Sequence, residues 1–294
     1  MKKLFYSQKL APYIFVLPFI LSFTLFFLYP VFSTIQMSFQ KILPGQVTYI
    51  GLKNYERLLN RHFYNALSTS ARYTFWTCAI LIPVPMMLAI FLNSKKMPAR
   101  NVFRATLFMP ILTSIIVAGT VFRLLFGEMD TAFVNSVLIR LGFEGIKWMR
   151  NKDFMIFLMV LLCCWRWMGV NILYYLSGLQ AIPNELYEAA DIDGAGALSK
   201  FRYITFPLLK PVTIYVLTIS IYAGFRMFEE SYVYWSMRTP GDIGLTIVVY
   251  LYRRAFQEND MGFGSAIGMV LLVIVLIVNI IQLTLTGAFK KEAN

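Results

Sequence analysis

The sequence predicts an all-α integral membrane protein with six transmembrane helices. Of its 294 residues, 58% are hydrophobic and only 14% are charged, and the mean hydropathy is +0.63. A soluble domain of this size has a larger polar surface, so the composition indicates a lipid bilayer as the solvent. Apolar stretches of about 20 residues, the length that crosses a bilayer as a helix, also recur along the chain. They lie near residues 11–35, 71–92, 105–126, 154–179, 208–228 and 264–286.

The order of the spans and the basic residues between them predict an orientation. The first apolar stretch is longer than the core of a signal peptide, about 7–15 residues, so we expect an uncleaved span. Six spans put both termini on one side of the membrane. The short loop after the second span contains no acidic residue, and short basic loops stay in the cytoplasm, so we expect this loop and both termini there. Its basic residues are Lys95, Lys96, Arg100 and Arg104.

Two further features modify the spans without changing their number. The apolar run Ile243–Tyr252 is about ten residues long, too short to cross a bilayer, and is predicted to form an interfacial or re-entrant helix. Pro83 and Pro85 in the second span and Pro110 in the third lack backbone donors, so we expect kinks there.

Several function classes are disfavoured by the residue inventory. The net charge is +12, but the basic residues flank apolar spans, where they orient the chain and contact anionic lipid rather than nucleic acid. The single histidine, His62, lies outside the spans, and Cys78, Cys163 and Cys164 lack C-x-x-C spacing. A catalytic triad with histidine and a multi-histidine metal site are therefore excluded within this chain, and we expect no cofactor and no enzymatic activity in it.

The most informative segment is the polar connection between the fourth and fifth spans, residues 181–211, which the predicted topology places in the cytoplasm. Asn184 follows Pro183 as a candidate N-cap, which favours a short helix. Gly194 and Gly196 then allow a sharp bend before a second short helix from about Leu198. The segment is therefore predicted to be a helix-turn-helix.

The first of these helices carries apolar residues on the aqueous side of the membrane. Such a surface favours a protein partner, although a loop folded back on its own bundle is the structural alternative. The apolar residues are Leu186, Ala189, Ala190 and Ile192.

The spacing in this loop resembles that of the integral-membrane permeases of ABC importers. Their signature is E-A-A, three residues, Gly, nine residues, then I-x-L-P, and here only Phe206 departs from it, in place of Leu. The resemblance implies a single type I importer permease domain over residues 1–294, with residues 181–211 as the cytoplasmic coupling loop. It also implies which residues contact the ATPase or shape the loop: Glu188, Ala189, Ala190, Asp191, Gly194, Ile204 and Pro207.

The same resemblance implies the partners. A cytoplasmic ABC ATPase dimer, which binds ATP and Mg, would receive the coupling helix, and a second homologous permease would supply the other half of the pore. An extracytoplasmic sugar-binding lipoprotein would deliver the substrate at the bacterial cytoplasmic membrane. Whether the pore is a homodimer or a heterodimer is left open by the sequence.

Longer stretches resemble the sugar branch of this family. Residues 50–59 (IGLKNYERLL), 103–110 (FRATLFMP) and 262–278 match segments of that branch. Residues 73–94, 165–180 and 224–233 resemble the arabino-oligosaccharide permeases of Gram-positive bacteria. We therefore expect a sugar or oligosaccharide as the substrate, with arabino-oligosaccharides favoured.

Polar groups among aromatic side chains mark candidate substrate contacts, because neutral sugars are held by stacked rings and hydrogen bonds. In the fourth span, Trp167, Asn171, Tyr174 and Gly178 share one helical stripe, with Arg166 beside it. In the fifth, Arg226 precedes two glutamates by three and four residues, near enough to pair along a helix. The candidates there are Phe225, Arg226, Phe228, Glu229 and Glu230. The alternative is that these charges satisfy one another, or reach the interface beside an aromatic belt.

Two other classes compete with the importer. A secondary transporter working without an ATPase would show internal repeats and ion-coupling carboxylates at mid-span, and neither is found. An intramembrane enzyme would need a nucleophile with its base inside the spans, and the single histidine, His62, lies outside them.

Overall fold

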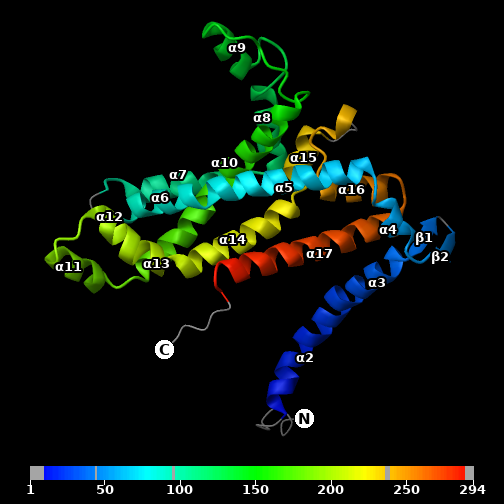
Figure 1. Cartoon of the computed structure of the whole chain (residues 1–294), viewed down its shortest axis with the longest axis horizontal. Coiled ribbons are helices and arrows are strands. Elements are labelled where there is room, and N and C mark those ends of the chain that lie inside the picture. The colour runs from blue at the N-terminus through cyan, green and yellow to red at the C-terminus, as the bar shows by residue number, and fades with distance from the viewer. Residues whose placement is uncertain (1–9, 44, 95–96, 236–238, 289–294) are drawn as a thin grey trace. The chain divides into compact units, whose positions relative to one another are not determined.

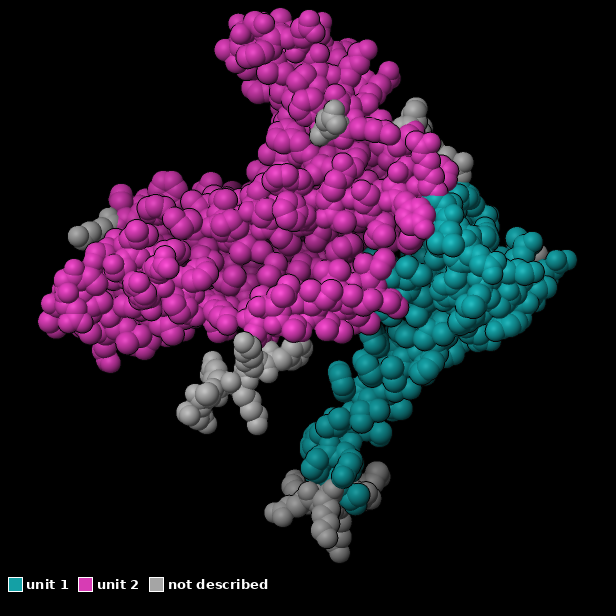
Figure 2. Space-filling model, in the orientation of Figure 1, with its two compact units in different colours: residues 1–60, 251–272 teal, residues 61–250, 273–294 magenta. Residues whose placement is uncertain are grey.

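The computed structural model describes residues 10–43, 45–94, 97–235 and 239–288, and most of these residues are helical (Figure 1). The chain divides into two compact units, which are coloured separately in Figure 2. Unit 1 comprises residues 1–60 and 251–272, and unit 2 comprises residues 61–250 and 273–294. Lys95 and Lys96, two of the four basic residues in the loop after the second span, lie outside the described residues.

Unit 1 contains the first span, a hairpin and the start of the last span. The first span is one helical rod, α2 (Ala11–Phe23), η1 (Thr24–Leu28) and α3 (Tyr29–Ser38), and within it only Ser38 is buried. The sequence did not lead us to expect the antiparallel hairpin that follows, β1 (Gln40–Leu43) and β2 (Gln46–Tyr49). The unit also holds three shorter pieces: α4 (Lys53–Arg57), η4 (Arg253–Gln257) and the first half of α17 (Met261–Leu285).

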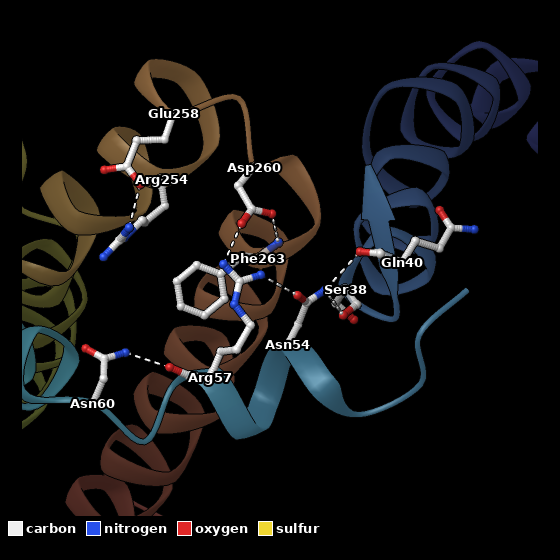
Figure 3. Close-up of polar contacts among 9 residues, drawn as sticks. All are labelled: Ser38, Gln40, Asn54, Arg57, Asn60, Arg254, Glu258, Asp260 and Phe263. Atoms are coloured by element: carbon white, nitrogen blue, oxygen red, sulfur yellow. Dashed lines mark hydrogen bonds and ion pairs between the residues drawn. The ribbon is translucent and has the colours of Figure 1, made fainter. Parts of the chain in front are cut away.

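A buried asparagine organises unit 1 (Figure 3). Asn54 has no exposed surface, and its Nδ2 donates to the carbonyl of Ser38 at 3.0 Å. Its Oδ1 accepts from Arg57 Nη1 at 3.1 Å. Arg57 pairs with Asp260 at 2.6 Å and lies 4.2 Å from the centre of the Phe263 ring. The end of the first span and the start of the last are therefore tied together by residues of α4.

Unit 2 is a helical bundle around the long helix α10 (Lys152–Gln180). Its other elements are α5 (Arg61–Leu81), α6 (Pro83–Asn93), α7 (Arg100–Leu112), α8 (Ile115–Leu125), α9 (Phe133–Arg140), α11 (Asn184–Ile192), α12 (Ala197–Lys200), η2 (Phe201–Thr205), α13 (Phe206–Leu208), α14 (Lys210–Phe225), α15 (Glu229–Tyr234), η3 (Pro240–Asp242) and α16 (Ile247–Tyr252), the last of which ends in unit 1.

Two hydrophobic clusters fill unit 2, and α10 contributes to both. We call the first the far core; it includes Tyr73, Leu81, Ala118, Trp148, Met155, Leu158, Met159, Leu162, Cys163, Tyr234 and Trp235. We call the second the coupling-side core; it includes Met86, Ala89, Leu92, Ile172, Tyr175, Leu176, Leu179, Ile182, Leu209 and Val216. The two cores divide α10 between Cys164 and Ile172.

The predicted spans are confirmed, with one change of geometry. Within the described residues five helices are long and apolar enough to cross a bilayer, at Ala11–Ser38, Arg61–Asn93, Phe154–Gln180, Lys210–Tyr234 and Met261–Leu285. The predicted third span is instead a pair of helices, α7 and α8, bent by 96°. Thr113 and Ser114 between them are extended, and Pro110 has already removed one backbone donor from α7. The count of six spans holds if this bent pair crosses once.

The apolar run after residue 243 forms only the short helix α16. Ile247 and Val249 have no exposed surface, so this segment is buried in protein rather than laid on an interface. The backbone N–H of Ile247 donates to Ser70 Oγ at 3.0 Å, and Thr246 Oγ1 donates to the carbonyl of Met227 at 3.1 Å. These bonds attach the segment to α5 and to the break between α14 and α15.

Candidate functional site

The predicted helix-turn-helix is present between α10 and α14. Figure 1 shows α11 and α12 at the end of unit 2 where α6 ends and α7 begins. The predicted cap is wrong by one residue, because α11 already includes Asn184, and Pro183 is the N-cap, without a side-chain hydrogen bond. The carbonyl of Pro183 accepts the N–H of Leu186 at 3.3 Å, and the carboxylate of Glu185 in the first turn interacts favourably with the positive end of the helix dipole.

The end of α11 explains the glycine of the motif. Gly194 has φ +73°, its N–H donates to the carbonyl of Asp191 at 3.1 Å, and the N–H of Ala195 donates to the carbonyl of Ala190 at 2.8 Å. This pair of bonds is the Schellman arrangement, which requires a left-handed residue after the helix. Glycine adopts that conformation without steric cost, so Gly194 sets where α11 stops.

One face of α11 is anchored to the bundle and the other is exposed. Tyr187 Oη and Thr205 Oγ1 share a hydrogen bond of 2.8 Å, and Tyr187 packs against the coupling-side core. An ion pair joins Asp191 to Lys200 of α12. Glu188 and Ala189 are exposed, as are 44% of Leu186 and 88% of Ile192. The loop is therefore neither free nor folded flat on the bundle.

The second half of the motif supports the first. Ile204 packs against the coupling-side core, and Thr205 beside it is 6% exposed. Pro207 is exposed in the short helix α13, which follows directly on the π-helical turn η2. Phe206, at the position where the family pattern has leucine, is 53% exposed. The motif thus combines side chains that anchor the loop with others that remain on its surface.

The four residues of the predicted stripe in α10 differ in how far they are buried. Trp167 is 39% exposed, whereas Asn171 is 6% exposed and donates from Nδ2 to the carbonyl of Leu81 at 3.0 Å. Tyr174 packs edge to face against Tyr215 at 5.3 Å. Gly178 faces α14 so closely that an added Cβ would lie 2.7 Å from Val212. Asn171 and Gly178 therefore join helices, and Trp167 remains accessible.

In the fifth span the helix breaks inside the predicted cluster. α14 ends at Phe225 and α15 begins at Glu229, so Arg226 and the glutamates do not share one helix. Arg226 instead donates to Tyr222 Oη at 3.3 Å. Among the described residues it forms no direct ion pair with either glutamate, so the predicted contact is absent, although its charge still interacts with that of Glu229.

Burial also separates the two glutamates. Glu229 and Arg226 are exposed, and Phe228 stacks on Tyr232 with ring centres 4.9 Å apart. Glu230 is 4% exposed and Phe225 is 6% exposed. The exposed members combine charge with a flat aromatic surface, the combination that sugars bind.

Sequence reasoning missed the surroundings of Glu230. Arg166 interacts with this carboxylate electrostatically across the two spans, and Arg166 Nε is buried without a hydrogen-bond partner among the described residues. Tyr73 of α5, Cys163 of α10 and Tyr234 of α15 are further ionisable neighbours of Glu230, besides the adjacent Glu229. No spacing rule could have found the neighbours on α5 and α10, because Arg166, Cys163 and Tyr73 precede Glu230 by 64, 67 and 157 residues.

Comparison with known proteins covers nearly the whole chain. A family model described as the inner membrane component of binding-protein-dependent transport systems matches residues 10–291. The chain is 60% identical over 291 residues to the arabinooligosaccharides transport system permease protein AraP of Bacillus subtilis (strain 168), covering 99% of this chain and 93% of that protein. The protein of the same name from Halalkalibacterium halodurans is 56% identical over 287 residues, covering 98% and 91%.

A solved structure shares the fold. A chain of a bacterial ABC transporter involved in the import of the acidic polysaccharide alginate has a TM-score of 0.84 at 21% identity, and 96% of each chain is covered. At this identity the likeness shows the fold alone, which is that of a type I importer permease. The family match decides between the importer and the secondary transporter, and it assigns the chain to transport rather than catalysis. This multi-pass membrane protein therefore belongs to the binding-protein-dependent transport system inner membrane components, the permease subunits of ABC importers.

Proposed function

We propose that this permease translocates arabino-oligosaccharides, and that α11 is the coupling helix through which an ATPase drives it. The substrate is supported by the two relatives whose names specify arabinooligosaccharides and which match nearly the full chain at 60% and 56% identity. The substrate favoured by the sequence is thus also the one proposed here.

The observation that carries the coupling role is the combination of anchoring and exposure in α11. Its Tyr187 is bonded to Thr205 and packs on the coupling-side core, while Glu188 is exposed on the same short helix. A rigid helix of this kind transmits the closure of an ATPase dimer on ATP to the spans on either side of it. Contact by Glu188, Ala189, Ala190 and Asp191 is part of this proposal.

The partners follow from the same role. A cytoplasmic ABC ATPase dimer binds ATP and Mg²⁺ and receives α11, a second, homologous permease completes the pore as a heterodimer, and an extracytoplasmic lipoprotein delivers the sugar. Both termini and α11 lie in the cytoplasm. The basic loop after the second span supports this orientation.

The substrate path is proposed to use the exposed half of the candidate residues. Trp167, Arg226, Phe228 and Glu229 are at least partly accessible and offer rings and charges to hydroxyl groups. The buried half positions this surface. Asn171, Phe225 and Glu230 are buried, and Arg166 and Tyr174, which are half-buried, belong to the same supporting group.

Reconstitution in proteoliposomes tests the proposal. The chain is combined with its second permease, the ATPase and the binding protein, and uptake of arabinotriose is compared with uptake of maltotriose. We expect ATP-dependent uptake of arabinotriose only from the complete complex. Uptake by the chain alone, or equal uptake of both sugars, would contradict it.

The orientation is tested separately. A cysteine replacing Glu188 in intact cells should react with a membrane-impermeant maleimide only after the cytoplasmic side has been opened. Labelling from outside would place α11 on the wrong side of the membrane and refute the coupling role.

A further inference from the structure

The second span is interrupted in a way that leaves a backbone carbonyl without its helical donor. α5 ends at Leu81 and α6 begins at Pro83. In a continuous helix the carbonyl of Leu81 would accept from residue 85, but Pro85 has no N–H. An unsatisfied carbonyl is costly in a bilayer, where no water replaces the lost donor.

A side chain 90 residues away supplies the missing donor. Asn171 Nδ2 of α10 donates to the carbonyl of Leu81 at 3.0 Å, and Asn171 is 6% exposed. This bond explains why a polar side chain is buried in the fourth span, and it uses the amide group that sequence reasoning assigned to the substrate.

The bond lies where the two cores of unit 2 meet. Leu81 belongs to the far core, whereas Met86 and Ile172 belong to the coupling-side core, on which Tyr187 of α11 packs. Two residues before Asn171, a Cβ on Gly169 would lie 2.1 Å from the carbonyl of Leu107 in α7. α10 is thus held against two neighbouring helices at the level of the break.

We propose that Asn171 is a positioning residue for transport: it locks α10 to the break in the second span, so that movement of α11 reaches α5 as well as α6. This inference rests on the proposed function, because it takes α11 to be the coupling helix. Without the lock, the break is a hinge at which α6 moves with the coupling-side core while α5 stays behind. Each ATP hydrolysed then moves less sugar across the membrane.

A double-mutant cycle tests the lock in the complete complex. Asn171→Leu removes the donor at similar volume, and Pro85→Ala returns a backbone N–H to the carbonyl of Leu81 within its own helix. Asn279→Leu is the matched control, because Asn279 Nδ2 bonds the carbonyl of Val275 in its own helix α17. Arabinotriose moved per ATP hydrolysed and the thermal midpoint of the complex are measured for each variant.

We expect Asn171→Leu to lower the sugar moved per ATP by about three- to tenfold, the range set by interhelical hydrogen bonds in membranes. Asn279→Leu should leave that ratio unchanged. Since Pro85→Ala makes the donor dispensable, the double variant should match Pro85→Ala alone.

Three results would overturn the inference. The first is a wild-type ratio for Asn171→Leu. The second is a double variant that falls as far below Pro85→Ala as Asn171→Leu falls below wild type, and this comparison remains valid if Asn171→Leu alone assembles poorly. The third is a double variant in which the thermal midpoint returns to that of Pro85→Ala but the arabinotriose moved per ATP does not. That result would mean that the bond has a structural role only. If uptake survives Glu188→Lys, the proposed function itself fails, and that result is distinct from all three.

Discussion

The coupling loop and the substrate path differ in what holds them together. In the loop, residues 188–207 carry the whole motif, and bonds within the loop shape it, such as those of Gly194 and Tyr187. The substrate-path candidates come from two spans, and neighbouring helices decide which of them are buried. A functional site built from consecutive residues can therefore be read from sequence in detail, whereas one built across helices cannot.

The largest expected effect lies on the exposed face of the loop. Glu188→Lys should reduce arabinotriose uptake at least tenfold, because it reverses a charge at the proposed contact with the ATPase. The thermal midpoint should not change, since Glu188 is exposed and has no ion pair among the described residues. Glu185→Lys, also exposed on α11, is the control and should keep uptake within about twofold. Equal losses from both variants would remove the special role of Glu188.

The two glutamates of the fifth span test whether burial divides the substrate path. Glu229→Gln should raise the KM for uptake about tenfold, because a hydrogen bond to a charged group contributes about 1.5–3 kcal/mol. Glu230→Gln should instead lower the thermal midpoint, because Glu230 is 4% exposed and the substitution changes a side chain packed between helices rather than the accessible surface. If Glu230→Gln changed KM and Glu229→Gln did not, the assignment of exposed and buried roles would be reversed.

The two glycines of the loop sharpen the claim that the loop is shaped locally. Gly194→Ala should cost about 1 kcal/mol in unfolding free energy, because alanine is strained at positive φ. Gly196 has φ −70° and open space around it, so Gly196→Ala should be nearly neutral. Thermal unfolding of the complex measures both. Similar losses of unfolding free energy for the two variants would mean that glycine is not required at position 194 for its left-handed conformation.

The smallest effect is expected where the loop meets the bundle. Tyr187→Phe removes the 2.8 Å bond to Thr205 and should cost about 1 kcal/mol, with about a twofold loss of sugar moved per ATP. Tyr203→Phe is the matched control, because Tyr203 is 74% exposed. A loss confined to stability, with the ratio intact, would show that this bond anchors α11 without transmitting its movement.

Particular residues show where sequence reasoning ended. The spans and the coupling motif were predicted because hydropathy and motif spacing are local properties. Asn184 was predicted as a cap because its side chain suits one, yet Pro183 takes that position. The pairing of Arg226 with Glu229 and Glu230 assumed a continuous helix, and the chain breaks between α14 and α15 instead.

By itself the sequence determined that the chain lies in a bilayer, where its spans run and which loop carries the coupling motif, since a bilayer requires each span to satisfy its own backbone hydrogen bonds. Tertiary structure decided the rest. Asn171 lies on a predicted substrate stripe, but Pro85 leaves the carbonyl of Leu81 unsatisfied, and only the packing of α10 beside α5 brings the donor to it. The role of a buried polar side chain depends on which groups its neighbours leave unpaired, and those neighbours are distant in sequence.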